Sequence, residues 1–371
     1  MLKKKILYIV EAMGGGVFTY IVDMANELVK EYDMYIAYAV RKQTPDNFKD
    51  YFDKRIHLIE VKNFKRSINP TSDLKALIEI IEIKKKVCPD IIHLHSSKAG
   101  VLGRIAFNGN KIPLFYTPHG YSFLMESYKP LKRKIFKFIE LICTKRNCIT
   151  ISCSKGEHQE TLKLTKKAIY VNNGINVTEL QKIIDRTEKN QHPFTVYTLG
   201  RICSQKNPEL FNSIAESLPN VNFIWIGDGE LRKELKSKNI EITGWIDRET
   251  AIKYAVNADV FLLPSRWEGL PISLLESMYM KKICIVSNVI GNRDVIHADS
   301  NGFICNDVNE YVDAIRIAQS ENNCLLKESA YQEINNLYNT KTMIQFYKKI
   351  YDASLKKKKI IMTMENELSG F

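Results

Sequence analysis

The segment from residue 263 to residue 278 places groups with distinct chemistry close together: Leu-Pro-Ser-Arg-Trp-Glu-Gly-Leu-Pro-Ile-Ser-Leu-Leu-Glu-Ser-Met. A short apolar run leads into it, and it opens a helical pattern. Pro271 suits the first turn of a helix, where its missing N–H costs nothing, and Gly269 allows the backbone to approach a ligand closely. The free N–H groups there would point at an anion, helped by the helix dipole. These groups belong to Leu270, Ile272 and Ser273.

Two carboxylates, Glu268 and Glu276, lie eight residues apart around this turn. A glycoside hydrolase needs its two carboxylates on opposite sides of the scissile bond, at about 5–10 Å from each other. Two groups on one loop and helix approach a ligand from the same side, so they suit hydrogen bonding to hydroxyl groups better. The alternative is a plain strand–loop–helix unit that carries glutamates on its surface.

Short apolar runs alternate with helical patterns along the whole chain. The runs are 5–10, 34–40, 56–61, 90–95, 114–119, 149–153 and 168–172 in the first half, and 195–199, 222–226, 240–243, 259–263, 283–287 and 302–305 in the second. Nearly continuous apolar strands that alternate with helices indicate parallel sheets covered on both faces. The predicted fold class is therefore α/β and doubly wound.

The chain has 371 residues, which suggests two domains, and the pattern indeed starts twice. A glycine turn follows the first strand of each half. We therefore expect two Rossmann-like domains that face each other across a cleft, with residues 178–193 as a linker and a long helix over about 327–359. The expected divisions are an N-terminal domain over 1–175, a C-terminal domain over 176–340, and a C-terminal helix that packs back on the N-terminal domain, with a tail, over 341–371.

Two other patterns could indicate a nicotinamide site and a metal site. The glycines at 14–16 lack the G-x-x-G continuation, and no acidic residue ends the second strand, which runs into Arg41 and Lys42. His93 and His95 would share one face of a strand, which can suggest a metal. No third ligand is nearby in the sequence and Asp-x-Asp is absent, so we expect neither cofactor nor metal.

Within this framework, the segment 263–278 resembles the E-x7-E motif of the retaining GT-B glycosyltransferases of family 4, the glycosyltransferases group 1. The resemblance covers about residues 5 to 350. One departure lies at 289–294, Val-Ile-Gly-Asn-Arg-Asp, where the family usually shows Gly-Gly before Asn-Arg-Glu, and we assign these residues no role. The other similar segments are Gly-Gly-Val-Phe-Thr-Tyr at 15–20, Asp-Ile-Ile-His-Leu-His-Ser at 90–96, Tyr-Thr-Pro-His-Gly at 116–120, Leu-Gly-Arg-Ile-Cys-Ser-Gln-Lys-Asn-Pro at 199–208, Gly-Asp-Gly-Glu-Leu at 227–231 and Thr-Gly-Trp at 243–245.

The resemblance implies a nucleotide-sugar site in the C-terminal half. Arg201 and Lys206 would hold the donor diphosphate, and fixed cations in a dry cleft would stabilise the charge that a departing nucleotide gains. Glu268 would orient hydroxyl groups of the donor sugar, and Glu276 the ribose of the nucleotide. The implied donor-binding set also contains Gly269 and Leu270.

In the N-terminal, acceptor-side half, the resemblance implies that Gly15 and Gly16 let the backbone approach the diphosphate. His119 would face the transferred sugar, although a structural histidine is the alternative, and His95 could line the cleft as well. The implied catalytic residues are His119, Arg201, Lys206 and Glu268.

The resemblance implies a retaining, metal-independent hexosyl- or N-acetylhexosaminyltransferase that needs no cofactor besides its nucleotide-sugar donor. A UDP-sugar is favoured, with GDP-mannose and dTDP-rhamnose left open. The stretch around His119 is most similar to capsule and exopolysaccharide members, which implies a lipid-diphosphate-linked saccharide acceptor in bacterial surface polysaccharide biosynthesis. Two alternatives are a nucleotide-sugar epimerase on a similar scaffold, and a basic nucleic-acid-binding protein, for which no binding motif is found.

The formal net charge of +12 favours an anionic partner. Residues 129–146 combine a basic cluster with apolar positions, which is typical of a helix at a membrane surface. The alternative is a helix packed in the core with a solvated basic face. No stretch approaches the ~20 apolar residues that cross a bilayer. We therefore expect a cytoplasmic protein that is peripheral on the inner face of the plasma membrane if this helix meets lipid.

Overall fold

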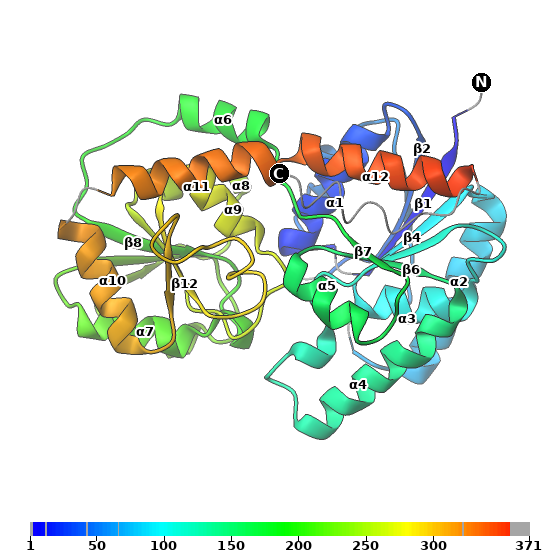
Figure 1. Ribbon diagram of the computed structural model, residues 1–371, viewed down its shortest axis with the longest axis horizontal. Coiled ribbons are helices and arrows are strands. Elements are labelled where there is room, and N and C mark those ends of the chain that lie inside the picture. Colours follow the sequence, from blue (N-terminus) through cyan, green and yellow to red (C-terminus); the bar gives the residue numbers. More distant parts are fainter. Residues whose placement is uncertain (1–2, 12, 42–43, 66, 321–322, 357–371) are drawn as a thin grey trace. The chain divides into compact units, whose positions relative to one another are not determined.

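The computed structural model describes residues 3–11, 13–41, 44–65, 67–320 and 323–356 (Figure 1). The tail expected beyond the last helix, 357–371, lies outside the described residues. The chain divides into two compact units. The N-terminal unit holds the chain up to Phe123, residues 130–172 and the chain from Lys341; the C-terminal unit holds residues 124–129 and 173–340.

The N-terminal unit is built on a seven-stranded parallel sheet. Its strands are β1 (Lys5–Val10), β2 (Asp33–Tyr38), β3 (His57–Glu60), β4 (Ile91–His95), β5 (Leu114–Thr117), β6 (Ile149–Ser152) and β7 (Ala168–Tyr170). They lie in the order β3-β2-β1-β4-β5-β6-β7. The direction of winding reverses between β1 and β4, and such sheets bind ligands beyond the carboxyl ends of the strands at the reversal.

The C-terminal unit repeats this plan with a six-stranded parallel sheet. Its strands are β8 (Thr195–Leu199), β9 (Asn222–Ile226), β10 (Ile240–Ile242), β11 (Val260–Leu263), β12 (Ile283–Ser287) and β13 (Phe303–Cys305). Their order is β10-β9-β8-β11-β12-β13, so the reversal lies between β8 and β11. The predicted fold class, two doubly wound Rossmann-like domains, is confirmed.

Helices follow most strands in both units. In the N-terminal unit they are α1 (Gly15–Leu28), α2 (Pro70–Val87), α3 (Ser97–Ala106), α4 (Pro130–Cys143), α5 (Lys155–Leu162) and α12 (Thr340–Leu355), of which Thr340 is counted with the other unit. In the C-terminal unit they are α6 (Val177–Arg186), α7 (Pro208–Ser217), α8 (Arg248–Val256), α9 (Ile272–Tyr279), α10 (Val308–Ser320) and α11 (Cys324–Leu337).

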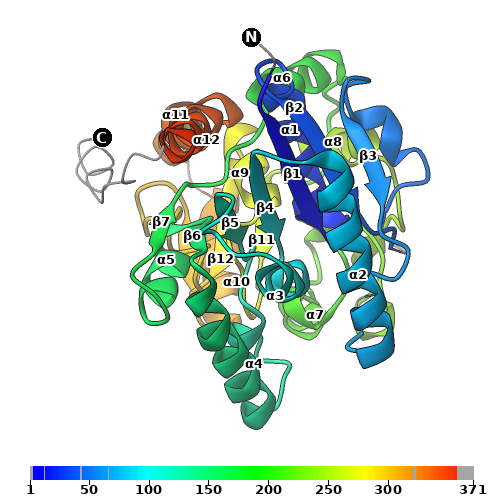
Figure 2. The same ribbon diagram turned by 90° about the vertical axis from the view of Figure 1, so that its right-hand side faces the viewer.

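The two faces of the N-terminal sheet are covered by different helices (Figures 1 and 2). Helices α1 and α12 bury their apolar side chains with Tyr8 and its neighbours on one face. Helix α3 covers the other face, where a side chain at Gly103 would collide with Leu94. Because residues of a strand alternate between faces, His93 and His95 point toward α1 and α12, on the opposite side from Leu94.

Two predicted elements were wrong. The stretch 178–193, expected to be a linker, is helical in its first part as α6. The single long helix expected from residue 327 is interrupted between α11 and α12. There, the N–H of Ile175 donates to Tyr338 O and the N–H of Thr340 donates to Ile175 O, at 2.9 Å each. This bridge to Ile175 replaces the helical hydrogen bonds at that point.

Candidate active site

In the C-terminal unit, the segment that follows β11 forms an ordered loop before α9. Pro271 was expected in the first turn of the helix. It is instead the N-cap residue of α9, directly before the first helical residue, with φ −74° and ψ 121°. The first N–H groups of a helix have no acceptor within it, so Ile272 and Ser273 can donate to a ligand. Asn173 Nδ2 donates to Leu270 O at 2.9 Å and so holds the loop in place.

Glu268 and Lys206 contact each other directly. Lys206 Nζ lies 2.7 Å from Glu268 Oε1, and both side chains are largely buried. Gln205 Nε2 donates to the other carboxylate oxygen at 3.1 Å and to Trp267 O at 3.0 Å. Both oxygens of Glu268 are therefore held by residues of the loop after β8, although the two segments lie more than 60 residues apart in the sequence.

Arg201 is held much less tightly. It follows Gly200 at the end of β8, and its Nε lies 3.9 Å from an oxygen of Glu230, a carboxylate that is 60% exposed. A pair at this distance with one exposed partner contributes little, so the guanidinium can bind an anion. Gly200 has φ 150°, and a side chain there would lie 3.2 Å from Lys206 Cε. A glycine at this position therefore lets Lys206 pass alongside the backbone.

Glu276 lies within α9 and is 3% exposed. Arg248, the first residue of α8, places Nη1 2.5 Å from Glu276 Oε1. The sequence reasoning missed Arg248, although the Asp-Arg-Glu around it marks a helix start. A ribose at Glu276 would therefore lie beside a cation as well as a carboxylate.

The departure from the family pattern at 289–294 has a structural counterpart. Gly291 has φ 86°, and a Cβ there would collide with Gly269 O and lie 3.3 Å from Glu268 Cβ. Its N–H donates to Asp294 Oδ2 at 3.2 Å. The single glycine in this segment is thus sufficient to let it pack against the loop that carries Glu268.

In the N-terminal unit, His119 lies just beyond β5. The strand was expected to include His119 but ends at Thr117, since Pro118 has no N–H to donate and His119 adopts a left-handed φ of 54°. Its Nε2 lies 3.1 Å from Nδ1 of His95, the last residue of β4. Desolvation lowers the pKa of His119 to about 3, so the imidazole is neutral at physiological pH.

Gly15 and Gly16 begin α1, directly after β1, and both are exposed. Gly15 has φ 57°, and a Cβ would meet no atom within 4 Å, so the glycine is required for its backbone conformation rather than for space. Tyr20, one turn further along α1, packs edge-on against the ring of His119 with centroids 4.7 Å apart. The glycine turn and His119 therefore both flank the β1–β4 reversal of this sheet.

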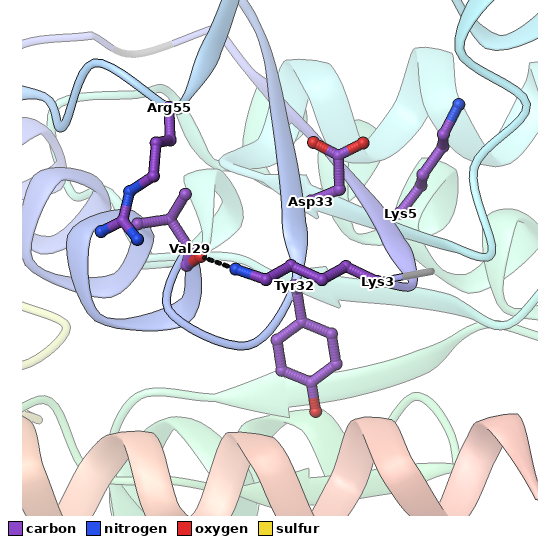
Figure 3. A pocket seen from close by; sticks show the side chains of 6 residues that line it. All are labelled: Lys3, Lys5, Val29, Tyr32, Asp33 and Arg55. Atoms are coloured by element: carbon purple, nitrogen blue, oxygen red, sulfur yellow. Dashed lines mark hydrogen bonds between the residues drawn. The ribbon is translucent and has the colours of Figure 1, made fainter. Parts of the chain in front are cut away.

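A hollow elsewhere on the N-terminal unit lies near the amino ends of β1 and β2 (Figure 3). It is lined by cations, but each has a partner. Lys3 Nζ donates to Val29 O at 2.8 Å, Lys5 Nζ donates to Val87 O at 3.2 Å, and Arg55 forms two hydrogen bonds with Asp53. This hollow is therefore not a candidate for the chemistry predicted from the sequence.

Among the described residues, no three His, Cys, Asp or Glu side chains gather as a metal site would require. Within the same part of the chain, no helix has the length and apolar character of a membrane span.

Comparisons with known proteins agree with the motif assignment. The family model of glycosyl transferases group 1 matches residues 146–336, and that of Glycosyltransferase Family 4 matches residues 14–179. A similar protein is the UDP-Gal:alpha-D-GlcNAc-diphosphoundecaprenol alpha-1,3-galactosyltransferase of Escherichia coli. It is 30% identical over 339 residues, which are 81% of this chain and 85% of that protein.

Two further proteins extend the likeness. The capsular polysaccharide biosynthesis glycosyltransferase CapM of Staphylococcus aureus is 24% identical, over 83% of this chain and 87% of CapM. HepE of Anabaena, solved in complex with UDP and glucose, superposes with a TM-score of 0.75 at 15% identity, covering 94% of this chain and 100% of HepE. The HepE likeness concerns the fold alone.

Proposed function

Since this chain belongs to the family 4, group 1 glycosyltransferases of GT-B fold, we propose that it transfers a hexosyl or N-acetylhexosaminyl group from a UDP-sugar to a lipid-diphosphate-linked saccharide. The observation that carries the proposal is the 30% identity to an enzyme whose acceptor is a sugar diphosphate of undecaprenol. The same enzyme takes its sugar from UDP-Gal, which supports the choice of nucleotide. The product would be a precursor of a bacterial surface polysaccharide, as the likeness to CapM suggests. Neither the epimerase nor the nucleic-acid-binding alternative is favoured by these relatives.

In the proposed reaction, the bond between the sugar C1 and the donor diphosphate breaks and a bond to the acceptor oxygen forms. The acceptor proton moves to an oxygen of the departing diphosphate, on the same face of the sugar, so the anomeric configuration is retained. Arg201 and Lys206 neutralise the charge of the diphosphate, which is the task that a metal performs in other transferases. Glu268 holds Lys206 in place and binds hydroxyl groups of the sugar.

The test is a transfer assay with purified protein, a panel of UDP-, GDP- and dTDP-sugars, and a synthetic N-acetylglucosamine diphospholipid as acceptor. The matched control acceptor carries the same sugar and lipid without the diphosphate. We expect transfer from a UDP-sugar to the diphospholipid only, unchanged activity in EDTA, and an NMR coupling constant at the new anomeric centre that matches the donor. Equal use of both acceptors would refute the acceptor class, and loss of activity in EDTA would refute metal independence.

We also propose that the protein lies against an anionic membrane through α4. Leu131, Ile135, Phe138 and Ile142 follow each other at helical spacing and are between 48% and 71% exposed. Lysines flank this stripe, and the opposite face of α4 is the one packed on the unit, where Glu140 is buried. An exposed apolar stripe with basic flanks fits a helix that lies in the headgroup region. The exposure of these apolar side chains favours the membrane surface over the alternative of a core-packed helix with a solvated basic face.

Co-sedimentation with vesicles tests this proposal. We expect binding to vesicles that contain phosphatidylglycerol, weaker binding to pure phosphatidylcholine, and loss of binding on Phe138→Ser with Ile135→Ser. A charge variant, Lys132→Gln with Lys134→Gln and Lys137→Gln, should lose only the preference for anionic lipid. The control is Lys85→Gln with Lys86→Gln on α2, which removes exposed lysines from another helix. Binding that ignores lipid charge would remove the main support for the proposal.

A further inference from the structure

His95 and His119 form a hydrogen-bonded pair at the carboxyl edge of the N-terminal sheet. Their facing nitrogens, Nδ1 of His95 and Nε2 of His119, are 3.1 Å apart, and the ring planes differ by 25°. His119 reaches this position through a left-handed backbone, a conformation that costs free energy for a residue with a side chain. The surrounding structure therefore maintains a specific placement of the His119 ring.

The other nitrogen of His95 lies in an apolar and aromatic environment. His95 is 0% exposed, and the rings of Tyr8 and His93 lie 4.6 and 4.1 Å from its own. Within the described part of the chain, its Nε2 has no hydrogen-bond partner. Burial lowers the pKa of His95 and of His119 below the ordinary value, so that both rings are neutral.

Two neutral imidazoles can share this hydrogen bond in two ways. If His119 donates from Nε2, then the proton of His95 must lie on its buried Nε2, where it has no acceptor. If His95 donates from Nδ1, then its Nε2 carries only a lone pair and His119 carries its proton on Nδ1. A buried N–H without an acceptor costs about 1–3 kcal/mol, and such orphaned donors are rarer than unpaired acceptors. The second arrangement is therefore favoured.

We propose that His95 is a positioning residue that fixes the proton of His119 on Nδ1, so that His119 donates a hydrogen bond to a substrate oxygen through that nitrogen. His119 then cannot serve as a general base there, since its Nδ1 has no lone pair to accept a proton. This agrees with the departing diphosphate as the proton acceptor. The identity of the substrate oxygen, in the donor sugar or its phosphate, rests on the proposed function; the position of the proton does not.

The tautomer is measured directly by two-bond proton–nitrogen correlation NMR on ligand-free protein labelled with nitrogen-15 at histidine. Signals are assigned by their loss in His95→Asn and His119→Gln. We expect Nδ1–H for both residues. Finding Nε2–H for His119 would overturn the proposal, whether or not a transferase activity has been detected.

A kinetic experiment compares two replacements of His95. Asparagine keeps an amide N–H near the position of Nδ1, whereas leucine removes the donor. We expect His95→Leu to lower kcat by about 10²-fold, as for loss of an aligned electrostatic donor, and His95→Asn to recover at least about tenfold of that loss. His57→Leu, at an exposed position of β3, is the control for loss of a histidine. Equal activity of the leucine and asparagine variants would contradict the positioning role.

Discussion

At the scale of single residues, the carboxylates of the proposed donor site have cationic partners within the protein. Lys206 pairs with Glu268, and Arg248 pairs with Glu276. A diphosphate that binds Lys206 would therefore compete with a carboxylate, whereas the ion pair of Arg201 to Glu230 is long, at 3.9 Å. Arg201 could thus bind the proposed donor without first breaking a close ion pair.

The cations can be tested one at a time. We expect Arg201→Ala and Lys206→Ala each to lower turnover by about 10²–10³-fold, because each removes a fixed charge that stabilises the leaving diphosphate. Steady-state kinetics with a saturating donor measures this. Arg316→Ala, which removes an exposed arginine on α10, serves as control. Near wild-type turnover in both site variants would refute the assignment of Arg201 and Lys206 to the diphosphate.

Gln205 provides a finer test of the same site. Its amide holds both Glu268 and the loop carbonyl of Trp267. Gln205→Ala should lower kcat by up to about tenfold, which corresponds to one hydrogen bond of about 0.5–1.5 kcal/mol, and Gln205→Glu should lower it further by placing a second carboxylate beside Glu268. If Gln205→Glu were as active as the wild type, Glu268 would not depend on this contact.

Motif resemblance pointed to Glu268, Glu276 and His119, but the sequence did not indicate that Gln205, Arg248 and His95, respectively, contact them. Each partner belongs to a different strand–helix unit from the residue that it contacts. Such contacts depend on which strands become neighbours in the sheet, and local patterns do not encode that order. The roles of the predicted site residues stay predictions.

At the scale of elements, a buried ion pair attaches α4 to the rest of the N-terminal unit. Arg104 Nη2 lies 2.6 Å from Glu140, and Tyr116 Oη donates to the same carboxylate at 3.0 Å. We expect Glu140→Gln to destabilise the N-terminal unit by about 3–5 kcal/mol, because it leaves a buried guanidinium without its counterion. Thermal unfolding measures the loss.

The matched comparison for Glu140→Gln is Asp313→Asn, which breaks a pair whose side chains are 63% and 69% exposed. That change should shift the midpoint very little. Replacing the whole ion pair by an apolar contact, with Arg104→Met and Glu140→Leu together, should recover part of the stability that Glu140→Gln loses. A Glu140→Gln protein that melts like the wild type would show that this pair does not hold α4.

The elements themselves were largely predictable, because buried parallel strands read as short apolar runs. The observed strands differ from the predicted ones mostly at their ends; the run expected at 114–119 stops two residues early. The predicted elements that were wrong lie where tertiary contacts determine the local structure. The break between α11 and α12 is set by Ile175, and no local helix-breaking residue announces it at Tyr338 or Asn339.

At the scale of the whole molecule, three histidines of the N-terminal unit, His93, His95 and His119, give it a dependence on pH. Burial holds the pKa of His93, His95 and His119 below the ordinary value near 6.5. The unfolded chain therefore binds more protons than the folded unit below pH 6.5, so stability is intact above that pH and falls as the pH drops. Each histidine contributes at most about 1.4 kcal/mol per pH unit, and for His119 the loss continues to about pH 3.

Hydrogen exchange followed by mass spectrometry can measure the pH dependence of stability in each unit separately. Between pH 7 and pH 5, after correction for intrinsic exchange, protection should fall in β4 and β5. Replacing His93, which is fully buried, with Asn should reduce that fall. Protection in β4 and β5 that stayed constant over this range would contradict neutral burial of these histidines.

Helix α12 follows the whole C-terminal unit in the sequence, yet Tyr347 and Tyr351 complete the apolar core around β1 of the N-terminal unit. Tyr351 Oη lies 3.0 Å from Tyr8 Oη and 2.6 Å from Nδ1 of His93. During synthesis on the ribosome, the first sheet therefore waits with one face incomplete until α12 has been translated, and the whole C-terminal unit is made in between. Maturation of the N-terminal unit is thereby tied to synthesis of its neighbour.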